Sequence, residues 1–398
     1  KEDFKAGVLE TGTDVIDLGI LPTPANYYSM WKLDVAGAIQ ITGSHNPPEM
    51  NGFKISFRRG AVFGRQIQEL RDTVEKQDFE TGTGTEVTYN ILQDYLEMIL
   101  GKIRLERDMK VAMDCGNASA CLVAPELFRK LGVSLTELYC DVDGSFPNHH
   151  PDPTVPENLK DLVGTVTEGD MELGIAYDGD ADRLGVVDET GQVVWADKIM
   201  ALFLPEIVEA GDDILFDVKC SQLLEDEITR LGGNPVIWKT GHSLIKQKMK
   251  ELGCKFAGEM SGHLFLGDDY FGYDDAIYVS ARFIQTLSRQ DRKLSRLVAR
   301  LPKYYSTPEM RLDCPSDEAK FDLAQKASDY FKKRYDCLDI DGVRIKFDDG
   351  WGLVRPSNTQ PVIVCRFEAK RPERMEEIKS LVLNRLQEMG EVTIPDDG

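Results

Sequence analysis

The chain has 398 residues, and its formal net charge at pH 7 is −21. The length allows two or three domains of ordinary size, the charge argues against a general surface for nucleic acids or membranes, and no apolar run reaches the about 18 residues that a membrane span needs. The 8 cysteines include no C-x-x-C pair, so we expect reduced thiols and a cytoplasmic location.

Segments of strand type and helix type alternate in the first part of the chain. Apolar runs predict strands at 15–18 and 36–41, and amphipathic spacing predicts helices at 24–32 and 65–75. A polar stretch rich in Gly and Thr at 80–88 indicates a linker.

Two later segments share one plan. In both 110–132 and 213–233, an apolar strand ends in Asp, and a small polar turn then leads to a helix that ends at Gly. A helix predicted at 89–103 precedes the first of them. We interpret the pair as a weak internal repeat of α/β units, with chance similarity between two common units as the alternative.

The last part has a different order of elements. We expect a long helix at 317–335, strands at 339–347, 350–357 and 361–369, and a closing helix at 373–389. This order favours a small α+β domain with helices on one face of an antiparallel sheet, after three α/β domains. The predicted domain boundaries are 1–88, 89–190, 191–304 and 305–398.

The stretch AYDGDADRLGVVDETG carries three carboxylates at alternate positions. In a tight loop the side chains of Asp178, Asp180 and Asp182 converge, and three like charges this close repel strongly unless a cation lies between them. Oxygen ligands of this kind suit Mg²⁺ or Ca²⁺. We therefore predict a metal site with positions left open for phosphate oxygens or water, and Arg183 lies beside it as a charge of opposite sign.

Two other interpretations of this stretch are weaker. The acidic positions also fit an EF-hand with Glu189 as its last ligand, but Arg183 stands where an EF-hand needs glycine. The flanking segments also have the pattern of strands and not of helices. A solvated acidic turn would leave an arginine directly beside three carboxylates unexplained.

A second candidate is Ser44, in the stretch ITGSHNPPEMNGFKI between two predicted strands. Alone, Ser44 fits an ordinary turn, because it is not in a G-x-S-x-G elbow and the adjacent His45 is poorly placed to act as a triad base. A serine that carries a phosphate needs no triad, and its phosphate oxygen could be the missing metal ligand. Pro47 and Pro48 would stiffen the loop, and Lys54 could return a cation to the site.

Two further stretches combine polar groups that suit a sugar. WKTGHSLIK places Lys239 and His242 at the end of a strand, before a helix. AGEMSGHLFL places Glu259, Ser261 and His263 at alternate positions, so that all three can share one strand face. Carboxylate, hydroxyl and imidazole groups together suit sugar hydroxyls, whereas a surface or capping role is an equal alternative for each histidine alone.

The stretch RPSNTQP lies between two predicted strands near the end of the chain. Its guanidinium, hydroxyls and backbone N–H groups suit an anion, although Pro, Ser and Asn also form plain turns. An anionic substrate would need a local basic cleft, because the sign of the whole molecule opposes it.

Four of these stretches together resemble the α-D-phosphohexomutase superfamily, and most closely its bacterial phosphomannomutase/phosphoglucomutase branch. They are TGSHNPP (the serine loop, 42–48), DGDADR (the acidic loop, 178–183), GEMSGH (the sugar loop, 258–263) and RPSNTQP (the phosphate loop, 355–361). The resemblance extends over the whole chain. It implies four domains with mixed sheets around a central cleft, and one loop from each domain.

The resemblance also implies roles for the residues. Ser44 would be the phosphoserine, with Lys54 or His263 as the proton-transfer group. Mg²⁺ would be held by a phosphate oxygen on Ser44 and by Asp178, Asp180 and Asp182. The sugar's 3- and 4-hydroxyls would be held by Glu259 and Ser261, and the phosphate that is not reacting by Arg355, Ser357, Asn358 and Thr359. The remaining substrate-binding and cleft residues would be His45, Arg183, Lys219, Lys239 and His242.

The implied reaction is the reversible conversion of hexose 1-phosphate and hexose 6-phosphate through a hexose 1,6-bisphosphate. The bisphosphate has to turn within the cleft, so we expect motion of the last domain. Family members carry further residues ahead of this start, including a first strand and an arginine-bearing stretch, so we expect the first domain to lack its N-terminal part. We expect a monomer or weak homodimer that binds phosphosugars, without nucleic-acid or membrane partners.

Three other functions stay open. The nearest is a phosphoglucosamine mutase, but in that branch the position between Glu259 and Ser261 is usually Gln, and Met260 favours mannose and glucose substrates. A metal-dependent phosphatase would carry the phosphate on an aspartate. The third is a truncated sugar-phosphate-binding relative with little activity.

Overall fold

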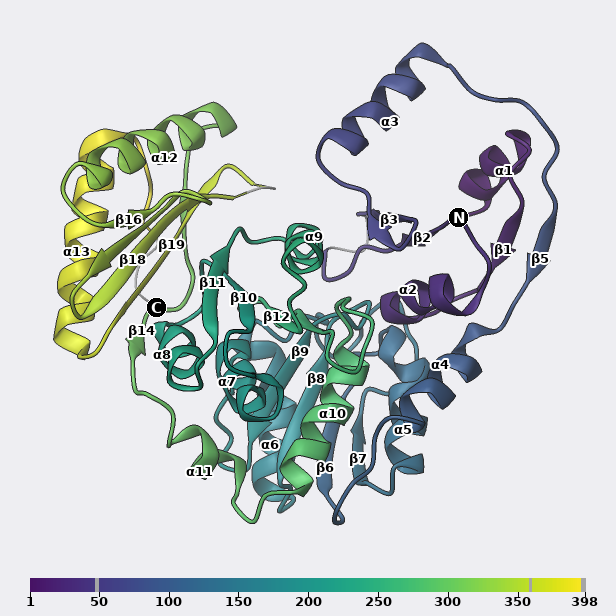
Figure 1. Ribbon diagram of the computed structural model, residues 1–398, viewed down its shortest axis with the longest axis horizontal. Coiled ribbons are helices and arrows are strands. Elements are labelled where there is room, and N and C mark those ends of the chain that lie inside the picture. Colours follow the sequence, from purple (N-terminus) through teal and green to yellow (C-terminus); the bar gives the residue numbers. More distant parts are fainter. Residues whose placement is uncertain (47–49, 358–359, 395–398) are drawn as a thin grey trace.

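The computed structural model describes residues 1–46, 50–357 and 360–394. Figure 1 shows four blocks of structure in chain order, with the first and last blocks on opposite sides of the two middle ones. Within the described ranges, no helix is both long enough and apolar enough to cross a membrane. None of the 8 cysteines is in a disulfide in the structure.

The second block is a mixed sheet covered by helices. Its elements are α4 (Ile91–Leu100), β6 (Lys110–Asp114), α5 (Ala124–Lys130), β7 (Ser134–Leu138), α6 (Lys160–Glu168), β8 (Leu173–Tyr177) and β9 (Leu184–Asp188), with short 3₁₀ turns at Ser119–Leu122 and Pro156–Leu159. The strand order is β7-β6-β8-β9, and β6 is parallel to both neighbours, whereas β9 is antiparallel to β8. β8 and β9 are buried along their whole length, which explains their nearly continuous apolar sequence.

The third block repeats this topology. Its elements are α7 (Ala196–Ile207), β10 (Asp213–Asp217), α8 (Gln222–Arg230), β11 (Asn234–Trp238), α9 (His242–Leu252), β12 (Phe256–Gly258), β13 (Leu264–Leu266), α10 (Ala276–Ser288) and α11 (Leu294–Val298). The order β11-β10-β12-β13 has the same parallel and antiparallel pairs as the second block. The predicted internal repeat of α/β units is therefore confirmed.

The second and third blocks share one hydrophobic core. Side chains of β6, β8 and β9 belong to the same buried cluster as side chains of α7 and α10. Polar contacts cross the same boundary, because the Tyr177 hydroxyl lies 2.7 Å from Ser280 Oγ, and the Tyr95 hydroxyl donates to Asp275 at 2.8 Å. The two middle blocks therefore pack as one unit that positions the loop between β8 and β9 and the loop between β12 and β13.

The first block contains two small sheets. Its elements are α1 (Glu2–Glu10), β1 (Val15–Asp17), α2 (Thr23–Lys32), β2 (Gly37–Ile41), β3 (Phe53–Phe57), β4 (Gly60–Ala61), α3 (Arg65–Lys76) and β5 (Glu86–Thr88). β2, β3 and β4 form an antiparallel sheet, and β1 pairs with β5 in parallel. The helix α2 is buried against the middle blocks through Tyr28, which contacts Tyr95, whereas α3 has no buried residue.

The linker predicted at 80–88 is wrong in its last three residues. Residues 86–88 form β5, whose register places Val87 opposite Ile16. The strand was hidden because it has only three residues, all of them exposed, which is too short for a pattern of apolar and polar residues to be recognised. Asp14 fixes the pairing locally, because its Oδ1 accepts from the Thr85 backbone N–H at 2.7 Å.

The fourth block confirms the α+β prediction. Its elements are β14 (Tyr305–Ser306), β15 (Met310–Asp313), α12 (Asp317–Lys332), β16 (Cys337–Leu338), β17 (Val343–Phe347), β18 (Gly350–Pro356), β19 (Val362–Ala369) and α13 (Pro372–Met389). Every strand pair is antiparallel within the described residues. The two helices cover one face of the sheet, and both contribute to a separate core with it (Figure 1).

The opposite face of this sheet packs on the third block. Trp351 and Leu353 of β18 are buried against Val218. The Trp351 ring lies under the Arg344 guanidinium, 4.0 Å from its centroid, and its Nε1 donates to Glu368 at 2.8 Å. Trp351 thus lies at the centre of a small apolar contact between the two blocks.

We predict that Trp351→Ala lowers the free energy of unfolding by about 3–5 kcal/mol, because it opens a cavity in this contact and removes the partner of a buried arginine. Urea unfolding measures the loss. The matched control is Phe321→Ala on the exposed side of α12, where 54% of the side chain is exposed and the change should stay within about 0.5 kcal/mol. Equal losses in the two variants would contradict this description of the contact.

Candidate active site

The four loops named from the sequence occupy equivalent places in their sheets. Each joins two antiparallel strands: the serine loop joins β2 and β3, the acidic loop β8 and β9, the sugar loop β12 and β13, and the phosphate loop β18 and β19. The first three loops meet directly. Pro47, Pro48, Asn358 and Thr359 lie outside the described residues.

Ser44 lies against the acidic loop. Its Oγ donates to Asp178 Oδ2 at 2.9 Å, and its backbone adopts a left-handed conformation with φ of 52°. This approach depends on Gly179, because a Cβ there would lie 2.0 Å from the Ser44 carbonyl oxygen. The structure therefore places the Ser44 hydroxyl beside the acidic loop, as expected if a phosphate on Ser44 shares a metal ion with these carboxylates.

The three carboxylates of the acidic loop converge as predicted. Asp178, Asp180 and Asp182 are buried, and their oxygen atoms lie within 4.8 Å of one another. Burial, together with the two neighbouring carboxylates, raises the pKa of Asp178 well above its ordinary value. Asp180 Oδ1 has no hydrogen-bond donor, and Asp182 Oδ1 faces His263 Nε2 at 3.2 Å. Buried oxygen atoms without donors are costly, and three such carboxylates are a donor set that fits a divalent cation.

Two cationic side chains offset part of this charge. Lys54 Nζ donates to Asp180 Oδ2 at 2.6 Å and also to Asp182 Oδ2, so the lysine does return to the site. Burial opposes its charge, but the two carboxylates raise the pKa of Lys54 well above its ordinary value. Arg183 Nε lies 3.9 Å from Asp178 Oδ2. The two carboxylates therefore favour the charged form of Lys54.

His45 contacts Ser44, but in an arrangement that agrees with the expectation that it is poorly placed to act as a triad base. Its Nδ1 lies 3.1 Å from Ser44 Oγ, and its Nε2 lies 3.3 Å from Arg183 Nη1. Burial and Arg183 lower the pKa of His45 to about 4, so the ring is neutral. Arg183 can only donate, so Nε2 accepts and Nδ1 carries the hydrogen. The ring thus donates to Ser44 Oγ and cannot take its proton.

The sugar loop differs from its predicted form. Residues 259–263 form a turn between β12 and β13 and do not share one strand face, because Gly262 has a positive φ of 99° and Glu259 N bonds to the His263 carbonyl at 2.9 Å. The three polar side chains still meet. His263 Nδ1 lies 3.0 Å from Glu259 Oε2 and 3.0 Å from Ser261 Oγ.

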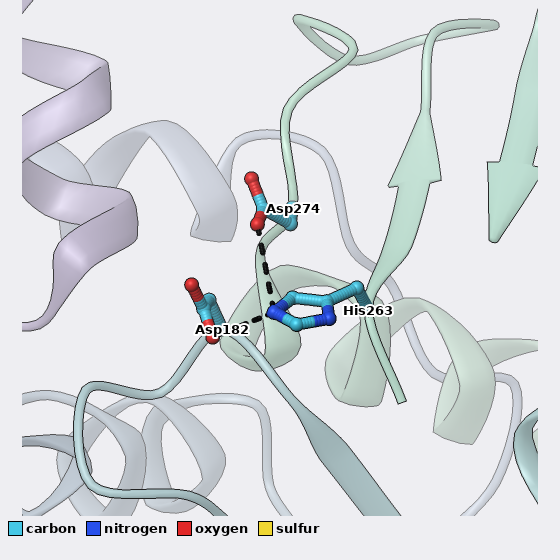
Figure 2. Close-up of side chains that lie close together, drawn as sticks. All are labelled: Asp182, His263 and Asp274. Atoms are coloured by element: carbon cyan, nitrogen blue, oxygen red, sulfur yellow. Dashed lines mark ion pairs between the residues drawn. The ribbon is translucent and has the colours of Figure 1, made fainter. Parts of the chain in front are cut away.

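His263 connects the sugar loop to the acidic loop. Its Nε2 lies 3.2 Å from Asp182 Oδ1, and Figure 2 shows Asp182 and Asp274 both directed at this nitrogen. Burial opposes a charge on the ring, but Asp182 and Glu259 raise the pKa of His263 to about 9. At neutral pH the ring is therefore an imidazolium that can give up a proton. Leu184 N also bonds to the Gly262 carbonyl at 3.1 Å, which ties the two loops together.

Arg355 and Lys219 lie at the contact between the third and fourth blocks. Arg355 Nε donates to Asp341 Oδ2 at 2.9 Å, and the same oxygen accepts from Thr240 N at 3.1 Å. Arg355 Nη2 is buried without a hydrogen-bond acceptor. Lys219 Nζ lies 3.1 Å from Glu309 Oε2. Lys239 is exposed at the end of β11, and Ser357 Oγ accepts from Gln360 N at 3.3 Å.

Sequence reasoning missed several residues that support the site. Thr23 Oγ1 donates to Asp180 Oδ2 at 2.6 Å, and His150 Nε2 lies 2.5 Å from the His45 carbonyl oxygen. Asp217, the last residue of β10, accepts from Thr240 Oγ1 and from Met260 N. Its position at a strand end in the repeated unit was visible in the sequence, but nothing there indicated which loops it would hold.

The chain matches sequence profiles for all four domains of one family. The phosphoglucomutase/phosphomannomutase α/β/α domain I profile matches residues 1–81, domain II matches 93–191, domain III matches 195–305, and the C-terminal domain matches 309–385. Together these matches extend over most of the chain.

Individual proteins agree with the profiles. The phosphomannomutase/phosphoglucomutase of Pseudomonas aeruginosa is 45% identical over 385 residues, which are 96% of this chain and 83% of that protein. The phosphoglucomutase of Neisseria meningitidis serogroup A is 41% identical over 387 residues, or 95% of this chain and 84% of that protein. A crystal structure of a phosphoglucomutase/phosphomannomutase family protein from Burkholderia thailandensis is 40% identical, with a TM-score of 0.89 over 97% of this chain and 86% of that one. The chain belongs to the phosphoglucomutase/phosphomannomutase family.

Proposed function

We propose that this chain interconverts hexose 1-phosphate and hexose 6-phosphate, with mannose or glucose as the sugar, through phosphoserine at Ser44. The observation that carries the proposal is the hydrogen bond of 2.9 Å from Ser44 Oγ to Asp178 Oδ2, inside a buried cluster of carboxylates and cations. A serine in an ordinary turn is not expected to make a hydrogen bond to a buried carboxylate of another domain.

The acidic loop would hold Mg²⁺. The ligands would be Asp178, Asp180 and Asp182, together with a phosphate oxygen on Ser44. Oxygen-only ligands suit this ion, and the buried Asp180 Oδ1 lacks a donor. The ion would supply positive charge to the phosphoryl group as it transfers.

The protein's own side chains prepare Ser44 for carrying a phosphoryl group. His45 Nδ1–H and Asp178 fix the direction of the hydroxyl, and Lys54 and Arg183 offset negative charge on the phosphate. His263 is the group suited to move a proton to or from a sugar hydroxyl, because its pKa of about 9 keeps it protonated yet able to release the proton. Lys54 holds its proton too tightly for that role.

The sugar would bind between the acidic and phosphate loops. Glu259 and Ser261 would hold two sugar hydroxyls, and the phosphate that is not reacting would lie against Arg355, whose buried Nη2 has no acceptor. The binding of this phosphate and of the sugar would be completed by Ser357, Asn358, Thr359, Lys219, Lys239 and His242. In this proposal each block, with boundaries near 88, 190 and 304, supplies one loop, and the hexose 1,6-bisphosphate turns between them.

We predict that Ser44→Ala lowers mutase turnover by roughly a thousandfold or more, because the phosphate carrier is lost. A coupled assay with mannose 1-phosphate and glucose 1-phosphate, primed by glucose 1,6-bisphosphate, measures it. Ser145→Ala, on an exposed turn of the second block, is the control and should keep the parent rate. Full activity of Ser44→Ala, or an acid-labile phosphate on an aspartate by mass spectrometry, would contradict the mutase and support a phosphatase.

We also predict that Mg²⁺ raises the unfolding temperature of the chain, because binding to the folded state alone stabilises it. Asp180→Asn should weaken this Mg²⁺ dependence by at least about tenfold in apparent affinity, since an amide brings no charge to the site. Thermal unfolding across a Mg²⁺ series measures both. Asp341→Asn, outside the acidic loop, is the control. If Asp180→Asn and the parent respond alike, the acidic loop does not hold the ion.

A further inference from the structure

Asp274 has no part in the function proposed above, yet it lies directly behind the active-site histidines. It is in the loop between β13 and α10, and the N-terminus of α10 is capped by Asp275 and not by Asp274. Its side chain is fully buried. A buried carboxylate is retained only when its partners compensate for lost hydration, so those partners reveal what it holds.

The two carboxylate oxygens of Asp274 have different partners. Oδ1 lies 2.7 Å from Lys246 Nζ, which makes the ion pair that keeps the carboxylate charged. Oδ2 lies 3.3 Å from His242 Nδ1 and 3.9 Å from His263 Nε2, and Figure 2 shows this oxygen directed at the His263 ring. One oxygen therefore faces the nitrogen atoms of two histidines from different elements.

The two histidine rings are stacked. Their centroids are 5.4 Å apart and their planes differ by 15°. His242 begins α9, and Lys246 follows one turn later on the same helix face. The Lys246 ammonium lies 4.1 Å from the centroid of the Tyr27 ring in α2. The carboxylate thus links α9, the sugar loop and, through Lys246, the first block.

The other partners of His263 do not fix the orientation of its ring relative to the ring of His242. Glu259 and Ser261 contact Nδ1, and Asp182 contacts Nε2. These contacts fix the two ends of the ring, but they do not relate it to His242. Asp274 is the carboxylate that contacts both histidines within the described part of the chain.

We propose that Asp274 is a positioning residue for phosphoryl transfer, whose carboxylate holds the stacked rings of His242 and His263 in one arrangement against the acidic loop. The inference rests on the proposed mutase activity. It requires no contact between Asp274 and substrate, because it acts through the two histidines. A misplacement of about 1 Å at a reacting group can cost about 10²-fold in rate, so loss of this carboxylate should be visible in turnover.

The test compares Asp274→Asn with Asp274→Glu in the coupled mutase assay. For Asp274→Asn we expect kcat to fall by about 10- to 100-fold with KM within about threefold, because the change alters positioning and not ground-state binding. Asp274→Glu keeps the charge and should recover part of kcat. A kcat of Asp274→Asn within about twofold of the parent would overturn the proposal.

The adjacent Asp275 offers a matched control. It is also fully buried, but it accepts from the hydroxyls of Tyr95 and Tyr270, at 2.8 and 2.5 Å, away from the histidines. Asp275→Asn should lower the unfolding temperature and leave kcat of the folded protein unchanged. If the two Asn variants lose kcat equally, Asp274 has only a structural role and the proposal fails.

Two further measurements keep the test decisive. If Asp274→Asn does not fold because Lys246 is left without a partner, Asp274→Glu takes its place, since it keeps the charge beside Lys246 but displaces the carboxylate, and its kcat should lie below that of the parent by more than about twofold. Should the parent itself prove inactive, the proposed function fails, and nitrogen-15 NMR of the histidine rings still tests Asp274. Unchanged His242 and His263 signals in Asp274→Asn would then overturn the inference.

Discussion

The structure depends on the balance of charge in one buried cluster where three blocks meet. Buried carboxylates repel one another unless cations and hydrogen bonds offset them. The acids are Asp178, Asp180 and Asp182 of the second block and Glu259 and Asp274 of the third. The cations that contact them are Lys54 of the first block, Arg183 of the second, and His263 and Lys246 of the third. Because these groups come from separate blocks, the balance exists only when the blocks are docked, so assembly of the site and docking of the first block depend on each other.

Repetition of one topology explains how the loops come together. In the second and third blocks the acidic loop and the sugar loop each connect the two antiparallel strands of an otherwise parallel sheet. The same edge of each sheet therefore carries the polar turn, and the shared core between the blocks brings the two turns into contact through Leu184 N and the Gly262 carbonyl. Arg183 and His263 place positive charge at this contact in a chain whose net charge is −21.

Much of this could be predicted from the sequence, because the decisive features are local. Period and turn residues identified the α/β units and the antiparallel last block, and the charge pattern of the acidic loop implied a cation that in turn gave Ser44 a role. The predictions that failed concern features that depend on contacts between segments far apart in the sequence. β5 has only three residues and no buried face, so no apolar run marks it. The turn at Gly262 breaks the strand expected for the sugar loop. Asp274 is one of two adjacent aspartates, and only the fold decides that one caps a helix while the other faces two histidines.

The central claim is that the serine loop and the acidic loop form one cation site with the phosphate carrier. The most direct measurement is anomalous diffraction from crystals of the Ser44 phosphoenzyme soaked with Mn²⁺. We expect a single strong peak within about 2.2 Å of oxygen atoms from Asp178, Asp180 and Asp182 and of an oxygen of the phosphate on Ser44. A peak at another cluster, or a peak that the phosphate on Ser44 does not approach, would contradict the claim.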